Sequence, residues 1–145
     1  MKLGSGAFRD GATIPAVHTC EGADRSPPLA WSGTPPEAKS LALICDDPDA
    51  PGKTWVHWVL FNIPPALTAL QENDAGGAVQ GMTDFRRVGY GGPCPPPGKP
   101  HRYFFKIYAL DVQLPLKAGA TKADVERAMQ GHVLAEAQLM GTFGR

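Results

Sequence analysis

The side chains of this sequence that could do chemistry fall into three short segments, and the first is an acidic turn. Asp46, Asp47 and Asp49 place three carboxylates within four residues, where they repel one another. Such a group is expected either to cap a turn in solvent or to supply one carboxylate that orients a histidine or meets a cationic ligand group. The sequence leaves both alternatives open.

The second segment is His57, which stands in an apolar run a few residues after the acidic turn. A buried imidazole needs a hydrogen-bond partner, so His57 is either a satisfied core histidine or part of a site. A neighbouring carboxylate would hold its tautomer and favour the charged form of the ring. The nearby acidic turn favours a site, and the sequence leaves both alternatives open.

The third segment, 101–103, follows a loop rich in proline and glycine. Side chains alternate along a strand, so His101 and Tyr103 share one face and Arg102 points away, where we expect a structural ion pair. Two histidines and a tyrosine hydroxyl suit a small anion such as phosphate, and a nearby carboxylate would suit an amine. A phosphorylated or zwitterionic headgroup is therefore a candidate ligand. We expect no cofactor and no metal, because no histidine or aspartate pair has the short spacing of zinc ligands.

These side chains must be positioned by strands. Residues 41–45 are continuously apolar, which is typical of a strand covered on both faces. Residues 55–63 alternate between two largely apolar faces, one of them carrying Trp55, His57 and Val59, and a third strand is expected at 101–110. A helical period runs from Thr121, a capping-box residue, to Met140, and Gly131 divides it into two short helices. The prediction is a mainly β fold with helices near the C-terminus.

Composition supports this fold class and excludes others. Glycine and proline number 17 and 15 of 145 residues, which argues against a helix bundle and for short strands and turns. The formal net charge is +0, so a general binder of nucleic acid is not expected. No apolar run is long enough to span a membrane, and no secretory signal begins the chain. We expect one domain over 1–145, located in the cytoplasm.

The 3 cysteines, Cys20, Cys45 and Cys94, are widely spaced and form no CxxC pair. In a cytoplasmic protein the expected state is three reduced thiols. A Cys20–Cys94 bridge, or one reactive thiol, is the alternative.

Several segments, taken in order along the chain, resemble the phosphatidylethanolamine-binding proteins, and most closely their bacterial Raf-kinase-inhibitor-like (YbhB/YbcL) branch. The most specific are the DPDAP run at 47–51 and the GPCPP run at 92–96 with HRY at 101–103; SPPLAW at 26–31, HWVLFNIP at 57–64 and GHVLA at 131–135 also match. The resemblance implies a β-sandwich of a large antiparallel sheet and a smaller sheet, with peripheral helices. It also implies a small anion pocket at one end.

By the same resemblance, each pocket residue of the family has a counterpart here. Asp47 is similar to the pocket aspartate, with Asp49 beside it, and a cis bond is implied at Ala50–Pro51. The remaining expected ligand-binding residues are two histidines, a tyrosine and two rim prolines: His57, His101, Tyr103, Pro95 and Pro96. The loop between 66 and 81 is short and a C-terminal extension is missing, so the kinase-inhibitory and lipid-binding behaviour of eukaryotic members is not carried over.

Three functions follow from these residues. The first is a binding protein for a small anionic ligand, which modulates a partner protein; the absence of a strong nucleophile–base pair favours it over turnover. The second is an acid/base hydrolase that uses the Asp–His–His–Tyr cluster. The third is an interaction protein with a vestigial pocket, whose exposed strand edges would permit a homodimer.

Overall fold

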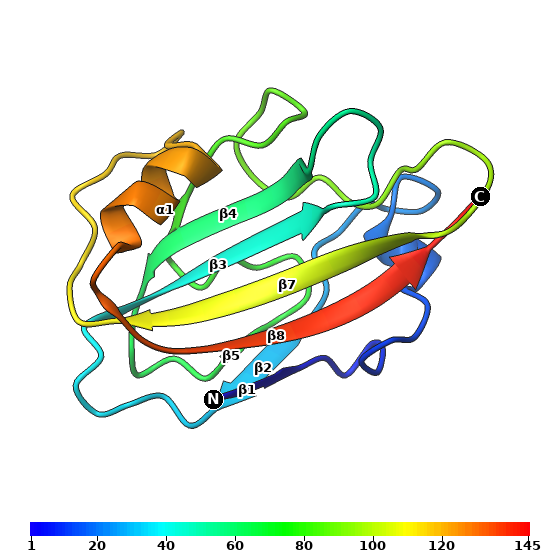
Figure 1. Ribbon diagram of the computed structural model, residues 1–145. Helices are drawn as coiled ribbons and strands as arrows, with labels where there is room; N and C mark the ends of the chain where they lie inside the picture. Colours follow the sequence, from blue (N-terminus) through cyan, green and yellow to red (C-terminus); the bar gives the residue numbers. More distant parts are fainter.

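Two antiparallel sheets form the fold of the computed structural model, which describes residues 1–145 (Figure 1). The larger sheet has five strands in the order β6-β4-β3-β7-β8, and the smaller has three in the order β1-β2-β5. The mainly β prediction is therefore confirmed. The strands are β1 (Lys2–Gly4), β2 (Leu29–Ser32), β3 (Ser40–Asp47), β4 (Trp55–Ile63), β5 (Ala69–Leu70), β6 (Val79–Gln80), β7 (His101–Leu110) and β8 (Val133–Phe143).

The central strand β3 is buried along its whole length, as its apolar run predicts. One face of the large sheet packs against the small sheet in a core cluster that includes Trp31, Leu43 and Phe105. The opposite face packs against Val125 of the helix α1 (Lys122–Met129), which lies beside β4 in Figure 1. A 3-10 turn, η1 (Ala16–His18), precedes β2. No helix of the structure is long and apolar enough to cross a bilayer.

The C-terminal segment corrects one prediction. The helix begins with the expected capping box, in which Thr121 and Asp124 bond each other's backbone N–H groups, but it ends at Met129. Residues from Val133 onward are not a second helix; they form β8, which pairs with the whole of β7. Leu139 and Phe143 both point into the core, as residues an even number of positions apart do on a strand. Pairing with the neighbouring strand therefore decides the structure here, although the sequence has a helical period.

A β-bulge in β4 determines where His57 points. Cys45 pairs with Trp58 but Asp46 pairs with Val56, so His57 is the extra residue of the bulge. Val56 consequently shares the cluster beneath α1 with Val59, although strict alternation places the two on opposite faces. The predicted grouping of His57 with Val59 is therefore wrong. The His57 ring instead packs against Tyr103, with the ring centroids 5.2 Å apart.

Candidate functional site

A cavity of about 250 Å³ lies at the end of the large sheet where β3 ends and β4 and β7 begin, near the C-terminus in Figure 1. Antiparallel pairing brings these strand ends together although they are far apart in the sequence. The lining residues come from the three strand ends and from the loops between them: Asp47, Ala50, Pro51, Trp55, His57, Phe85, Cys94, Pro95, Pro96, His101 and Tyr103. Six of the seven predicted site residues are among them, and Asp49 is not.

The first polar element of the cavity is the pair formed by Asp47 and His101. The Nδ1 atom of His101 lies 2.7 Å from Oδ2 of Asp47, and both side chains are buried. The other carboxylate oxygen of Asp47 accepts a hydrogen bond of 2.7 Å from the backbone N–H of Asp49. An aspartate does orient a histidine here, but that histidine is His101 and not His57.

The second polar element is His57, whose Nδ1 atom lies 2.6 Å from the carbonyl oxygen of Gly91. A carbonyl can only accept, so Nδ1 carries the ring proton and the tautomer is fixed. Burial lowers the pKa of His57, and this outweighs the opposing effects of the Gly91 carbonyl and the Asp47 carboxylate. The expected preference for a charged ring is therefore wrong, because no carboxylate contacts His57 directly.

Three polar atoms remain without partners in the protein. No protein group forms a hydrogen bond with Nε2 of His57, with Nε2 of His101 or with the hydroxyl of Tyr103. The two imidazole rings bond the protein through Nδ1 instead. A fully enclosed side-chain polar atom without a hydrogen bond occurs only at Thr34. The three unbonded atoms are therefore not enclosed by protein, and because their residues line the cavity, they reach it. Burial raises the pKa of Tyr103, which keeps its hydroxyl protonated at neutral pH. The cavity thus offers a phenol O–H donor and two imidazole nitrogens to a ligand.

Asp49, which the resemblance places in the site, is not part of the lining and is paired with Arg102. Its two carboxylate oxygens each lie 2.9 Å from the Arg102 guanidinium, and the Arg102 backbone N–H donates to Oδ2 as well. These hydrogen bonds lower the pKa of Asp49 to about 2. The expectation of an ion pair for Arg102 is confirmed, and that ion pair holds the Asp49 side chain away from the cavity.

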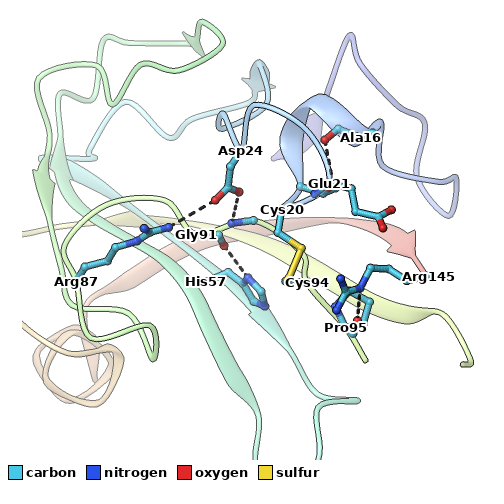
Figure 2. Close-up of a disulfide and its surroundings, with 12 residues drawn as sticks. Ala16, Cys20, Glu21, Asp24, His57, Arg87, Gly91, Cys94, Pro95 and Arg145 are labelled. Atoms are coloured by element: carbon cyan, nitrogen blue, oxygen red, sulfur yellow. Dashed lines mark hydrogen bonds and ion pairs between the residues drawn. A yellow bond between two sulfur atoms is a disulfide. The ribbon is translucent and has the colours of Figure 1, made fainter. Parts of the chain in front are cut away.

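A disulfide between Cys20 and Cys94 fastens one wall of the cavity (Figure 2). The expectation of three reduced thiols is wrong; the alternative bridge is present, and Cys45 is free and buried. The two Cα atoms are 5.4 Å apart, within the range that a disulfide can span. The backbone N–H of Cys20 also donates to the Pro93 carbonyl, and Asp24 accepts from the Gly92 N–H, so the loop is held at successive residues.

The neighbouring turn departs from a second expectation. The structure contains no cis peptide bond, so the implied cis bond at Ala50–Pro51 is wrong. Gly52 has a φ of +81°, a left-handed conformation that glycine adopts readily. The chain turns at this glycine instead. Ala50 and Pro51 nevertheless line the cavity.

The sequence and the fold both match known proteins. A family model described as "Phosphatidylethanolamine-binding protein" matches residues 4–144. This chain belongs to that family. It is 59% identical to a "UPF0098 protein" of Methanothermobacter thermautotrophicus over 100% of this chain and 99% of the relative, and 48% identical to one of Chlamydia muridarum over 99% and 98%.

Two solved structures of phosphatidylethanolamine-binding protein homologues superpose closely. The homologue CT736 from Chlamydia trachomatis gives a TM-score of 0.95 at 44% identity, covering 99% of this chain and 97% of that one. YbcL of E. coli, described as a member of the mammalian family, gives 0.92 at 36% identity over 99% and 98%. The predicted family resemblance and its YbcL-like character are confirmed.

Sequence reasoning missed the aromatic wall of this family member's cavity. Trp55 and Phe85 lie edge to face at 5.7 Å, and Phe85 also packs against His57 at 5.2 Å. Trp55 carries a usable signal, since it stands two residues before His57 in the same strand. Phe85 has none, because it belongs to a loop that only the folded structure brings over the strand.

Proposed function

We propose that the cavity binds a small anionic group, either free phosphate or the phosphorylated headgroup of a larger molecule. One observation carries this proposal: two histidines direct Nδ1 into the protein and Nε2 into the same cavity, where a tyrosine hydroxyl joins them. Phosphate oxygens are strong acceptors that pair with such N–H and O–H donors. The lining contains no serine or free thiol, because Cys94 is in a disulfide, and this favours binding over nucleophilic catalysis.

Binding of an anion is coupled to protons in this arrangement. In the neutral ring of His57 the proton sits on Nδ1, so Nε2 is an acceptor and would repel an anionic oxygen. A bound anion therefore favours protonation at Nε2, which turns it into a charge-assisted donor. His101 offers a second Nε2 to the same cavity, and the Asp47 carboxylate lies against its Nδ1. We expect the affinity for sulfate, whose own charge is constant near neutrality, to rise as the pH falls from 7.5 to 6.

The phosphoryl part of a headgroup fits the cavity better than an amine does. Asp47 is the only acidic side chain of the lining, and both its oxygens are already bonded, to His101 and to the Asp49 N–H. An ammonium group would find no free carboxylate there. The ammonium of phosphoethanolamine is therefore expected to lie outside, near the edge of the aromatic wall.

The experiment is an NMR titration of the histidine ring signals with phosphate, phosphoethanolamine and acetate. His57 and His101 should shift together and saturate with phosphate. His18 and His132 serve as internal controls, because neither lines the cavity. Equal affinity for phosphate and phosphoethanolamine would show that the phosphoryl group alone is recognised. If neither cavity histidine responds while the protein is folded, the proposal is wrong.

Matched variants complete this test. His57→Gln and His101→Gln should each weaken phosphate binding, whereas His132→Gln should leave it unchanged, because the His132 ring is half exposed and bonds only Asp111. Hydrolysis of a panel of phosphate esters or carboxylic esters that disappears in His57→Gln would support the hydrolase alternative instead.

A further inference from the structure

The charges around the cavity do not balance for an anionic ligand. Asp47 is the one residue of the lining with a fixed charge, and that charge is negative. Burial keeps His57 neutral in the empty cavity. Protonation of His57 on binding, as proposed above, only offsets the charge of Asp47, so the charge of a phosphate calls for a further cation from beyond the lining.

Three cationic side chains contact residues of the lining from outside. Lys53 lies over the Trp55 ring at 5.9 Å, and Arg87 lies over the Phe85 ring at 5.8 Å. The third, Arg145, donates a hydrogen bond of 2.7 Å from Nε to the carbonyl oxygen of Pro95. Each of the three cations therefore lies beside a different residue of the cavity wall: Trp55, Phe85 or Pro95.

Two of these cations are already neutralised by carboxylates. Lys53 is 2.8 Å from Asp84, and Arg87 is 3.5 Å from Asp24, as Figure 2 shows for the second pair. Arg145 forms no ion pair, and its two terminal nitrogens make no hydrogen bond within the protein, since only Nε is engaged. Arg145 is therefore the cation of the three that keeps its charge and its outer donors available.

Arg145 is also held at the rim at two points. Its Nε atom binds Pro95, and one oxygen of its main-chain carboxylate accepts a hydrogen bond of 3.2 Å from the Gly98 N–H. Figure 2 shows the guanidinium against Pro95. Its field reaches into the cavity: burial raises the pKa of Tyr103, and the Arg145 charge opposes that rise.

We propose that Arg145 is a specificity-determining residue that makes the cavity prefer a doubly charged phosphate over a singly charged anion. A guanidinium offers several donors in a planar fork that matches phosphate oxygens, and it stays charged at any physiological pH. Held on the Pro95 carbonyl, it supplies the charge that the lining lacks. This inference rests on the proposed function and names the residue that sets the charge of the ligand.

The test is calorimetric titration of phosphate and of acetate into the wild type, Arg145→Gln and Arg145→Lys at constant pH and low salt. Loss of a charge-assisted contact should weaken phosphate binding about tenfold in Arg145→Gln. Acetate affinity should change less than about twofold, and the salt dependence of phosphate binding should become shallower. Arg145→Lys keeps the charge and should lie between the wild type and Arg145→Gln. Arg86→Gln, which removes an arginine outside the lining, is the control and should bind as the wild type does.

Each of the other possible results of these titrations contradicts a different part of the proposal. Unchanged phosphate affinity in Arg145→Gln overturns the role of Arg145 alone. Equal weakening of phosphate and acetate in both variants, with the salt dependence unaltered, shows that Arg145 merely holds the Pro95 loop, and this also overturns the inference. Failure of the wild type to bind phosphate overturns the proposed function itself.

Discussion

Asp46 and Asp47 are adjacent in β3, and both are buried, with 1% and 3% of their surface exposed, yet they lie on opposite faces of the large sheet. Asp46 faces outward, where Lys122 at 2.8 Å and Lys106 at 3.3 Å compensate its charge. Asp47 faces the cavity, where its partner is the His101 ring. Two aspartates that are neighbours in the sequence thus have different partners, because alternation along the strand places them on opposite faces.

The difference shows how a structural carboxylate can be told from one in a candidate binding site. The partners of Asp46 are two ammonium groups, and one of them belongs to the first residue of α1, so this pair fastens the helix to the sheet. The partner of Asp47 has a second nitrogen that no protein group engages, and that nitrogen reaches a cavity. A change at Asp46 should therefore alter stability, whereas a change at Asp47 should alter ligand binding.

The largest effect concerns the cross-link on the cavity side. Its half-cystines are 74 residues apart, so replacing Cys20 and Cys94 by Ala should lower the free energy of unfolding by about 4 kcal/mol through the entropy of the unfolded chain. Phosphate affinity should also fall, because Cys94 forms part of the wall. Urea denaturation with and without a reductant measures the loss, with Cys45→Ala as the control for thiol effects. A loss below about 1 kcal/mol would show that the disulfide adds little to the stability of the cavity side.

The second effect is that of Asp46→Asn, which leaves two lysines without their countercharge. Breaking a buried ion pair is strongly destabilising, but both lysines are partly exposed, so we expect a loss of about 2 kcal/mol. Urea denaturation measures this loss, and phosphate titration should give the wild-type affinity. An altered affinity with intact stability would reverse the assignment of the two aspartates.

Asp47→Asn should show the opposite pattern. The amide keeps an oxygen for the Asp49 N–H but removes the charge that holds the His101 ring in place. We expect phosphate binding to weaken about tenfold, the value of a charge-assisted hydrogen bond, with a smaller loss of stability than in Asp46→Asn. Calorimetry and urea denaturation on the two variants side by side decide between the patterns. Wild-type phosphate affinity in Asp47→Asn would remove Asp47 from the site.

The smallest effect is a pH dependence due to His57. Its pKa in the folded protein lies below the ordinary value near 6.5, so the unfolded chain binds more protons in the interval between them. Stability is therefore complete above about pH 6.5 and falls as the pH decreases through the lower, folded pKa. Thermal unfolding from pH 8 to 5 should show this slope in the wild type and a weaker one in His57→Gln. Equal slopes in the two proteins would contradict the assignment to His57.

Much of the fold and most of the cavity could be predicted from the sequence. The apolar run at 41–45 and the alternation at 101–110 are local signals, and both strands form where expected. The features that were missed depend on pairing between distant segments. β8 is a strand because β7 offers it a partner, and the Cys20–Cys94 bridge depends on a loop that lies 74 residues away in the sequence. The position of His57 depends on a bulge that no local pattern reveals.

That bulge divides β4 into two stretches that are out of phase. Trp58 and Leu60 follow the register of the core, whereas Val56 keeps the opposite phase, and His57 absorbs the offset. Deleting one residue here would restore simple alternation and turn the imidazole away from Tyr103 without moving the core residues after it. A change of length in the loop before Trp55 would act differently, because it would move the wall residues Ala50 and Pro51 but leave the phase of β4 unchanged. The orientation of His57 is thus sensitive to an insertion or deletion at this point of β4, whereas the other register shifts of the sheet, at Leu41–Leu43 and at Ala109–Leu110, lie at its far end.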